Sequence, residues 1–306
     1  MSNTDTSLIQ EDILLRIKEK TKRLNSMRPL PKDAMKRFRE DLRLQHTYHS
    51  NAIGGNTLTL PETRLVIEEG ITTGGKTLRE HLEAINSVRA YDLIEDIAGK
   101  KKEIDHDTIR QVHETVMEGI LEDAGEYRTE NVKITGATPP DWSQVIRLMD
   151  KLIKEISWSN MHPVGTSAFL HHGFVNFHPF VDGNGRVARL LTNLYLIVRG
   201  YPPIILKKGD KMRYFRSLKA ADAGNPAPFA NFIAKAVDES LSLHLSAFGG
   251  DDELLPLKEL ARETPYSQEY LSLRARQGFL DSVKMGRVWY SSKRAVGDYV
   301  SGHGKK

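Results

Sequence analysis

Hydrophobic residues recur at intervals of three and four positions along most of the chain, which is the spacing of helices with one buried face. Ile13, Leu14 and Ile17 show this spacing near the start, and Pro29 and Pro31 separate the first two such segments. The pattern therefore predicts a mainly α-helical protein. We expect helices over residues 11–25, 32–46, 61–70, 77–97, 107–117, 143–157, 163–177, 186–198, 211–223 and 228–245.

The periodicity changes after a glycine-containing linker at residues 248–252. Residues 283–285 and 288–290 have the character of short strands around a Gly-Arg turn. Helices are expected over 257–261, from Ser267 to Gly278, and over 293–300. This order of elements resembles a winged helix-turn-helix, so we expect a small separate domain over residues 252–306.

The composition of the 306 residues limits the class of protein. Hydrophobic residues make up 39% of the chain, which is enough for a packed core. No apolar run reaches the roughly 18 residues of a membrane span. The absence of cysteine excludes disulfides and cysteine-bound zinc and favours a reducing compartment. Because residues 1–12 are also polar and acidic, unlike a secretory signal, we expect a cytoplasmic protein without a membrane partner.

Positive charge is concentrated at the C-terminal end. From Leu257 onward ten Lys and Arg residues accompany five Asp and Glu, a net charge of +5. The whole chain carries +4, so residues 1–256 carry 4 − 5 = −1. Four basic residues of this region could contact DNA phosphates, namely Arg274, Arg276, Lys284 and Arg287. Many modules of this kind bind protein instead, so DNA and protein are both retained as alternative partners of this region.

The densest chemistry lies in residues 178–189, His-Pro-Phe-Val-Asp-Gly-Asn-Gly-Arg-Val-Ala-Arg. The stretch combines a base, a carboxylate, a glycine turn and two guanidinium groups. Pro179 biases His178 away from helical backbone, so the preceding helix should end at His178. The glycine turn then leads into the N-terminus of a helix, where free N–H groups favour an anion such as phosphate.

Other interpretations of residues 178–189 are weaker. A structural glycine turn would explain the glycines but not the charged side chains. The spacing of Gly183, Gly185 and Ala188 fits a dinucleotide fingerprint, but neither the preceding strand nor the later acidic residue is present. A metal-dependent phosphohydrolase could use a set of three histidines and one aspartate, although no metal-site spacing is evident. Its candidate ligands are His171, His172, His178 and Asp182.

Residues 178–189 resemble, without a departure, the HPFx[D/E]GNGRxxR motif of Fic-domain proteins, and most of the chain resembles them too. The resemblance implies a Fic-type helical core over residues 106–248 with a β-hairpin flap. It also implies transfer of AMP from ATP to a Ser, Thr or Tyr hydroxyl of target proteins and of the chain itself. In this motif His178 is the general base and Asp182 holds Mg²⁺. The ATP-binding residues are Asp182, Gly183, Asn184, Gly185, Arg186 and Arg189.

Residues 50–55, within an N-terminal helical region over 1–105, resemble the inhibitory [S/T]xxxE[G/N] motif of the same family. Ser50 and Gly55 fit the first and last positions, but Gly54 stands where the family has glutamate. In the family that glutamate pairs with the second motif arginine, here Arg189, and prevents a productive ATP pose. The resemblance therefore implies a derepressed enzyme. A plain glycine turn that was never inhibitory is the alternative.

The resemblance also assigns the flap and the adenine pocket. The flap corresponds to residues 125–136, where alternation at Val132 and Ile134 is typical of a short strand. Flap residues expected at the ATP site are Val132, Lys133, Ile134 and Thr135. Residues matching the adenine pocket are Tyr214, Phe215 and Asp222, with a core role for Tyr214 as the alternative. A nucleotide-sensing DNA-binding regulator remains a second hypothesis for the whole chain, and a homodimer is left open.

Overall fold

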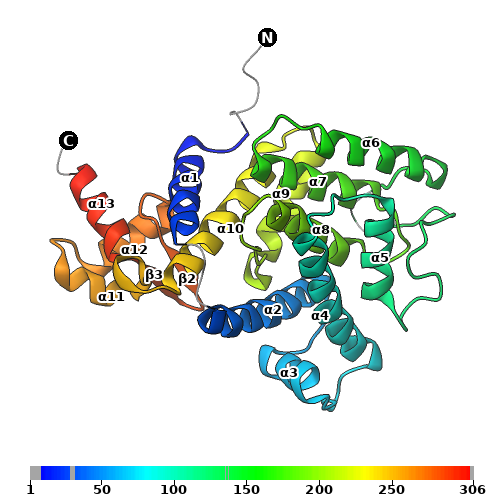
Figure 1. The fold of residues 1–306 in the computed structure, drawn as a ribbon, viewed down its shortest axis with the longest axis horizontal. Helices are drawn as coiled ribbons and strands as arrows, with labels where there is room; N and C mark the ends of the chain where they lie inside the picture. Colours follow the sequence, from blue (N-terminus) through cyan, green and yellow to red (C-terminus); the bar gives the residue numbers. More distant parts are fainter. Residues whose placement is uncertain (1–7, 28–31, 135, 137, 304–306) are drawn as a thin grey trace, which may run out of the picture. The chain divides into compact units, whose positions relative to one another are not determined.

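Helices make up most of the computed structural model, which describes residues 8–27, 32–134, 136 and 138–303 (Figure 1). The predicted mainly α-helical class is confirmed. The helices are α1 (Glu11–Ser26), α2 (Lys32–Gly54), α3 (Leu60–Arg64), α4 (Leu78–Gly99), α5 (His106–Met117), α6 (Val145–Ser157), α7 (Pro163–Phe177), α8 (Asn184–Val198), α9 (Lys211–Asp222), α10 (Ala227–Ser246), α11 (Leu257–Leu260), α12 (Gln268–Gln277) and α13 (Lys293–His303). The strands are β1 (Leu255–Pro256), β2 (Val283–Met285) and β3 (Val288–Ser291).

The chain forms two compact units, and each is assembled from two segments. The first comprises residues 1–14 and 39–237, and the second comprises residues 15–38 and 238–306. In the first unit α8 packs against α4, α5 and α7. Its apolar residues, including Val187 and Leu191, are fully buried in the core. The core therefore fixes the helix that begins in the motif.

Capping side chains define where the helices beside α8 begin. The Thr77 side chain accepts the Glu80 N–H, and the Glu80 carboxylate accepts the Thr77 N–H, which closes a capping box at α4. The Asp105 carboxylate accepts the Thr108 N–H at α5, 2.7 Å away. Each such cap contributes about 1 kcal/mol.

Helix α2 is longer than the sequence pattern predicts. The expected helix stopped at His46, but α2 continues to Gly54, and Gly55 ends it with φ of 108°. Asn51 holds this last part, because its amide donates to the Glu83 carbonyl and its Oδ1 accepts the Ser87 hydroxyl. The continuous helix places Ser50 and Gly54 one turn apart on the same face.

Two other local predictions require correction. The helix expected over residues 61–70 is α3 followed by a π-helical turn, Leu65–Glu69, which ends at Gly70 with φ of 67°. The described residues of the predicted flap form no strand, and a single bridge position occurs at Ile134. The Arg128 guanidinium donates to the carbonyls of Glu130 and Pro140 on either side of this segment. Thr135 lies outside the described residues.

The second unit contains an antiparallel sheet in the order β1-β3-β2, with Val283 opposite Tyr290. From α11 to α13 its helices and strands follow the order predicted from the sequence, while the assignment as a winged helix remains a prediction. The Ser267 side chain caps α12, and Gly278 ends α12 in the left-handed region at φ of 82°, as expected. A small core formed by α11, α12 and α13 includes Leu260, Leu271 and Tyr299.

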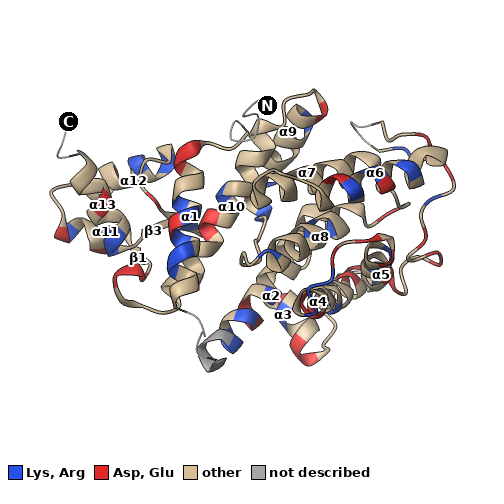
Figure 2. Cartoon of the chain, turned by 45° about the horizontal axis from the view of Figure 1, so that its top comes forward, with Lys and Arg blue, Asp and Glu red and all other residues tan. Residues whose placement is uncertain are grey.

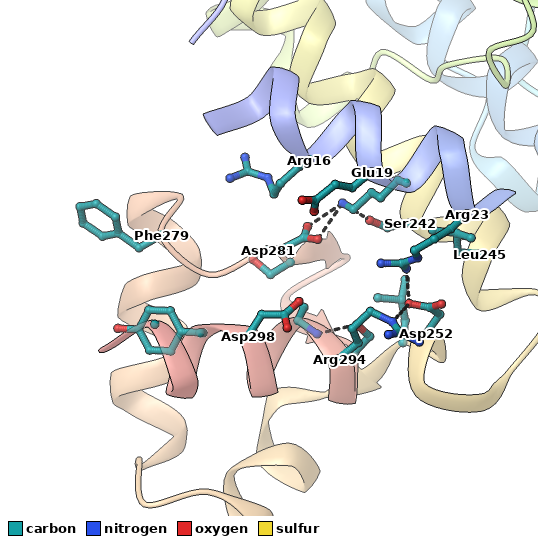
Figure 3. A pocket seen from close by; sticks show the side chains of 17 residues that line it. Arg16, Glu19, Arg23, Ser242, Leu245, Asp252, Phe279, Asp281, Arg294 and Asp298 are labelled. Atoms are coloured by element: carbon teal, nitrogen blue, oxygen red, sulfur yellow. Dashed lines mark hydrogen bonds and ion pairs between the residues drawn. The ribbon is translucent and has the colours of Figure 1, made fainter. Parts of the chain in front are cut away.

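A buried ionic network lines a cavity of about 410 Å³ within the second unit (Figure 3). The Lys20 ammonium donates to Asp238, Ser242 and Asp281 at 2.6, 2.7 and 2.8 Å. Burial alone would lower the pKa of Lys20, but the two carboxylates outweigh it and raise that pKa. Asp252 accepts from Arg23 and Arg294 on the other side of the cavity. The cations and anions of this cavity are therefore mostly paired with one another.

Lysine and arginine are interspersed with aspartate and glutamate along the helices of both units (Figure 2). Within the described part of the chain, no helix combines the length and apolar character that a membrane crossing requires.

Candidate active site

His178 ends helix α7, as the sequence predicts. Its backbone is in the left-handed region, with φ of 48° and ψ of 61°. The imidazole Nδ1 lies 3.3 Å from the Val175 carbonyl, and this acceptor requires the proton to be on Nδ1. Burial, together with the charge of Arg128, lowers the pKa of His178. The lowered pKa favours the neutral imidazole, and a proton on Nδ1 leaves Nε2 as the nitrogen with an open lone pair.

Arg128 holds the same loop from the other side, a role that sequence reasoning missed. Its guanidinium Nε donates to the His178 carbonyl at 2.8 Å, and its backbone N–H donates to the Pro179 carbonyl at 2.9 Å. Arg128 is buried, with 3% of its surface exposed. No local pattern could identify this role, because the His178 carbonyl that it binds lies 50 residues further along the chain.

The turn before α8 is shaped by Gly183 and Asn184. Gly183 has φ of 78°, and a Cβ there would lie 2.8 Å from the Met117 sulfur, so only glycine fits. The Asn184 side chain accepts from the Phe180 N–H and donates to the Phe180 carbonyl, at 3.0 and 2.8 Å. Its amide thus closes the loop. The N–H groups of Arg186 and Val187 donate to the Gly183 carbonyl, so only the first two N–H groups of α8, those of Asn184 and Gly185, come before the helical bonding pattern.

Asp182 lies in an ion-pair network with two arginines. The Arg79 Nη2 contacts its Oδ2, and the Arg186 Nη2 lies 3.7 Å from the same oxygen. Burial raises the pKa of Asp182, but the Gly183 N–H and the two arginines outweigh burial and lower it. Glu83 completes the network, since its carboxylate lies 3.3 Å from Arg79 and 3.4 Å from Arg186. The sequence pattern did not identify Arg79 or Glu83 as members of the site.

Arg189 is buried, with 4% of its surface exposed, and it is bound by neutral groups. Its Nε donates to Ser50 Oγ and its Nη2 donates to the Ser50 carbonyl, each at 2.8 Å. Burial lowers the pKa of Arg189, and no carboxylate pairs with it among the residues that the structure describes. Gly54, one turn beyond Ser50, adjoins open space.

One cavity of about 790 Å³ in the first unit brings most of the predicted site residues together. Those that line it are Gly54, Ile134, His178, Asp182, Gly183, Asn184, Gly185, Arg186, Arg189, Tyr214, Phe215 and Asp222. Ser50 bonds Arg189 without lining the cavity, and Val132 and Lys133 do not line it.

The three residues matched to an adenine pocket differ in exposure. Phe215 is half exposed, at 48%. Asp222 accepts from His172 and Asn176, at 2.8 and 3.0 Å. Tyr214 is buried among core aromatics, with its hydroxyl 2.9 Å from His171 Nε2. The buried position of Tyr214 therefore agrees with the alternative prediction that it is a core residue.

The histidines proposed for a metal phosphohydrolase do not assemble. His171 is bonded to Tyr214 in the core, and His172 is bonded to Asp222. Within the described ranges no three His, Cys, Asp or Glu side chains gather as a metal site. A single carboxylate such as that of Asp182 would suit Mg²⁺, because proteins often bind this ion through one carboxylate together with the phosphates of a nucleotide.

A neutral imidazole, a helix N-terminus and two buried arginines around one cavity suit a helical protein that binds a phosphorylated ligand. Residues 103–196 match the Fic/DOC family. Fic-1 (aa134–508) from C. elegans superimposes with a TM-score of 0.70 and 31% identity, over 78% of this chain and 72% of that one. This chain therefore belongs to the Fic/DOC family.

Two further relatives support the assignment to this family. A Fic domain containing signaling protein from Bacteroides thetaiotaomicron gives a TM-score of 0.71 at 28% identity, covering 76% of this chain and 96% of that one. The protein adenylyltransferase Fic of Drosophila willistoni is 35% identical over 249 residues, which is 80% of this chain and 50% of that protein. The chain thus spans about half the length of the curated relatives it matches.

Proposed function

We propose that this chain is a protein adenylyltransferase that transfers AMP from ATP to a Ser, Thr or Tyr hydroxyl of target proteins and of itself. The observation that carries the proposal is the meeting of His178, the N-terminus of α8 and Arg189 at one cavity. The name of the insect relatives supports it, since they are called protein adenylyltransferases.

The proposed reaction uses His178 as the general base. The target hydroxyl oxygen bonds to the α-phosphorus of ATP while the bond from that phosphorus to the β-phosphate oxygen breaks. Pyrophosphate leaves, and the hydroxyl proton passes to His178 Nε2. The hydrogen bond from Nδ1 to the Val175 carbonyl supports this role because it fixes the tautomer that has a free Nε2.

The negative charge of the phosphates would be met by the N-terminus of α8 and by two arginines. At this N-terminus Arg186 and Val187 donate their N–H groups to the Gly183 carbonyl, so the N–H groups of Asn184 and Gly185 are the ones proposed to meet the phosphates.

Arg186 is buried, and its guanidinium, which pairs with Glu83 and Asp182, is a further cation for the phosphates; its Nη1 makes no hydrogen bond to the described residues. Arg189, unlike Arg186, has no acidic partner among the described residues, which supports its binding of the terminal phosphate.

Asp182 would hold Mg²⁺ together with the ATP phosphates. Bound there, the ion would neutralise charge on the phosphates and on the departing pyrophosphate. Because Arg79 and Arg186 already contact Asp182, its carboxylate is kept ionised and directed at the cavity.

We further propose that Gly54 leaves the enzyme derepressed. Ser50 contacts Arg189, and residue 54 lies one helical turn further on the same face of α2. A glutamate at position 54 would therefore reach the guanidinium that is proposed to receive the terminal phosphate. Glycine has no side chain to do so.

The test is incubation with α-labelled ATP and Mg²⁺, with the label on protein read after denaturing electrophoresis. His178→Ala should abolish labelling but leave ATP binding and the melting temperature almost unchanged. His106→Ala, which alters a histidine away from the cavity, is the matched control. Release of inorganic phosphate without labelled protein would favour a phosphohydrolase and contradict the proposal.

A nucleotide-sensing DNA-binding regulator remains the second hypothesis, because α12 and the β2–β3 hairpin carry exposed Arg276, Lys284 and Arg287. DNA binding by the full chain would be steeply salt-dependent and would survive His178→Ala. The same hairpin also exposes Met285 and Val288, and a flat response to salt would favour a protein partner.

A further inference from the structure

Arg79 is a third arginine at the cavity, and it comes from helix α4 rather than from residues 178–189. The capping box of Thr77 and Glu80 fixes the start of α4 and places Arg79 in its first turn. Arg79 lines the same cavity as Asp182 and Arg186. Its side chain is half exposed, at 52%, so the guanidinium can change partners without disturbing the core.

The position of Arg79 is unfavourable for helix α4 itself. The first turn of a helix is the positive end of its macrodipole, where acidic side chains stabilise the helix and basic side chains destabilise it. Glu80 in this turn follows that preference, and Arg79 opposes it. The acidic partners of Arg79 are Glu83 and Asp182, which both line the cavity. The guanidinium is therefore held by carboxylates of the site and not by the helix end.

The two carboxylates that hold Arg79 differ in how firmly they are fixed. Glu83 lies one turn further along α4, and its Oε1 is 3.3 Å from Arg79 Nε. The Glu83 side chain is largely buried, and its Oε2 accepts from the Asn56 amide at 2.9 Å. Asp182 is half exposed and meets Arg79 Nη2 from the loop before α8. The contact with Asp182 is thus the one that can be exchanged.

Both carboxylate oxygens of Asp182 have partners in this arrangement. Oδ1 accepts the Gly183 N–H at 2.6 Å, and Oδ2 is contacted by Arg79 Nη2. Arg186 Nη2 is further away, at 3.7 Å from Oδ2. A Mg²⁺ ion held by Asp182 would bind a carboxylate oxygen at about 2.0–2.1 Å. A guanidinium on Oδ2 would then lie beside a divalent cation and be repelled by it, so Arg79 and Mg²⁺ are alternative partners of Asp182.

The ion pair of Arg79 with Asp182 also changes what the phosphates of ATP meet beside α8. A carboxylate without a nearby cation would repel phosphate there, whereas an ion pair is close to neutral. Arg79 therefore supplies at Asp182 part of the positive charge that Mg²⁺ supplies when bound. It is the weaker counter-ion, because it carries one charge where the ion carries two.

We propose that Arg79 substitutes for Mg²⁺ at Asp182 and competes with the ion for that carboxylate. Its guanidinium neutralises Asp182 until Mg²⁺ and ATP bind, and it then withdraws to Glu83. The inference rests on the proposed function, in which Asp182 holds Mg²⁺. Arg79 thereby supports ATP binding without the metal and reduces the amount by which Mg²⁺ strengthens that binding.

The test measures ATP affinity by calorimetry in excess MgCl₂ and in EDTA, and the ratio of the two affinities reports the coupling between metal and nucleotide. All proteins carry His178→Ala, so that ATP is bound but not transferred. Arg79→Met keeps an unbranched apolar side chain and removes the charge and the donors. We expect it to raise the ratio by about fivefold, the upper value for an exposed ion pair, mainly by weakening ATP binding in EDTA. Arg79→Lys retains the charge and should keep the ratio close to that of the protein with Arg79.

The matched control is Arg89→Met. Arg89 is on the same helix, and its half-exposed guanidinium contacts Glu118, but it does not line the cavity. The variant removes the same charge and the same kind of ion pair from α4. It should therefore leave the ratio of ATP affinities in MgCl₂ and EDTA unchanged, even if it lowers stability.

The outcomes separate this inference from the proposed function. If Asp182→Asn removes the effect of Mg²⁺ on ATP affinity and Arg79→Met leaves the ratio unchanged, the role of Arg79 is wrong and the proposed metal site stands. If Asp182→Asn keeps the full effect of Mg²⁺, Asp182 does not hold the ion, and the inference about Arg79 fails with it. An equal rise of the ratio in Arg89→Met would also overturn the role of Arg79, because the loss of any arginine from α4 would then have the same effect.

Discussion

The guanidinium of Arg189 donates two 2.8 Å hydrogen bonds to Ser50, one to its hydroxyl and one to its carbonyl. These bonds join the motif helix α8 to helix α2, whose last residue is Gly54. A Cβ built on Gly54 meets nothing within 4 Å. The position opposite the second motif arginine is therefore open to a longer side chain.

Gly54→Glu should suppress protein labelling by at least about tenfold. A desolvated carboxylate bound to Arg189 would destabilise the reactive orientation of bound ATP by a few kcal/mol. Gly54→Gln, which has nearly the same size without the charge, should label almost normally. Labelling rates and ATP affinities of both variants provide the measurement, and affinity should change less than rate. Equal labelling by Gly54→Glu and the unchanged protein would show that residues 50–55 are an ordinary helix end.

Asp182→Asn should remove the saturable dependence of labelling on Mg²⁺ and reduce the rate by about a hundredfold. The amide keeps the shape of the carboxylate but loses the charge that would bind the ion. Initial rates measured against MgCl₂ concentration test this prediction. Asp150→Asn alters a carboxylate that pairs with His106 instead, and it should change neither the rate nor the dependence. Unchanged Mg²⁺ dependence in Asp182→Asn would place the ion elsewhere.

The acid limb of the pH–rate profile should reflect the lowered pKa of His178. The neutral imidazole is the active form, and burial with the charge of Arg128 holds its pKa below the ordinary value of 6.5. Protonation as the pH falls should therefore reduce kcat/KM with a midpoint below pH 6.5. The measurement is kcat/KM against pH. An acid limb centred above pH 6.5 would mean that His178 is not the titrating base.

Gly183→Ala should destabilise the protein by about 1–3 kcal/mol and disturb the phosphate turn. Its added Cβ would lie 2.8 Å from the Met117 sulfur, and its φ of 78° disfavours alanine. Gly99→Ala, at an open position near the end of α4, is the control and should be close to neutral. Denaturant unfolding of the two variants makes the comparison. Equal stability of both would mean that Met117 and the turn adapt without cost.

Much of the first unit was predictable because its signals are local. Helical periodicity predicted α4 to α10, and Pro179 predicted that α7 would end at His178. In the second unit, the cap at Ser267 and the stop at Gly278 were equally local. A long motif with a specific spacing identified the residues around the α8 N-terminus.

The remaining features depend on contacts between distant parts of the chain. Arg79 and Arg128 reach Asp182 and the His178 carbonyl from 103 and 50 residues away, and nothing in their local sequence marks them. The extension of α2 beyond His46 depends on Asn51, whose partners are on α4. The sequence predicted Tyr214 as an aromatic ring for adenine, but its hydroxyl bonds His171 in the core, 43 residues away along the chain.

The central claim is the identity of the transferred group, and parallel labelling with α-labelled and γ-labelled ATP tests it most directly. Transfer of AMP leaves the α-phosphorus on the protein and releases the γ-phosphorus within pyrophosphate. We therefore expect covalent label from α-labelled ATP alone, and no such label in His178→Ala. Covalent label from γ-labelled ATP, or inorganic phosphate released with no labelled protein, would contradict the account.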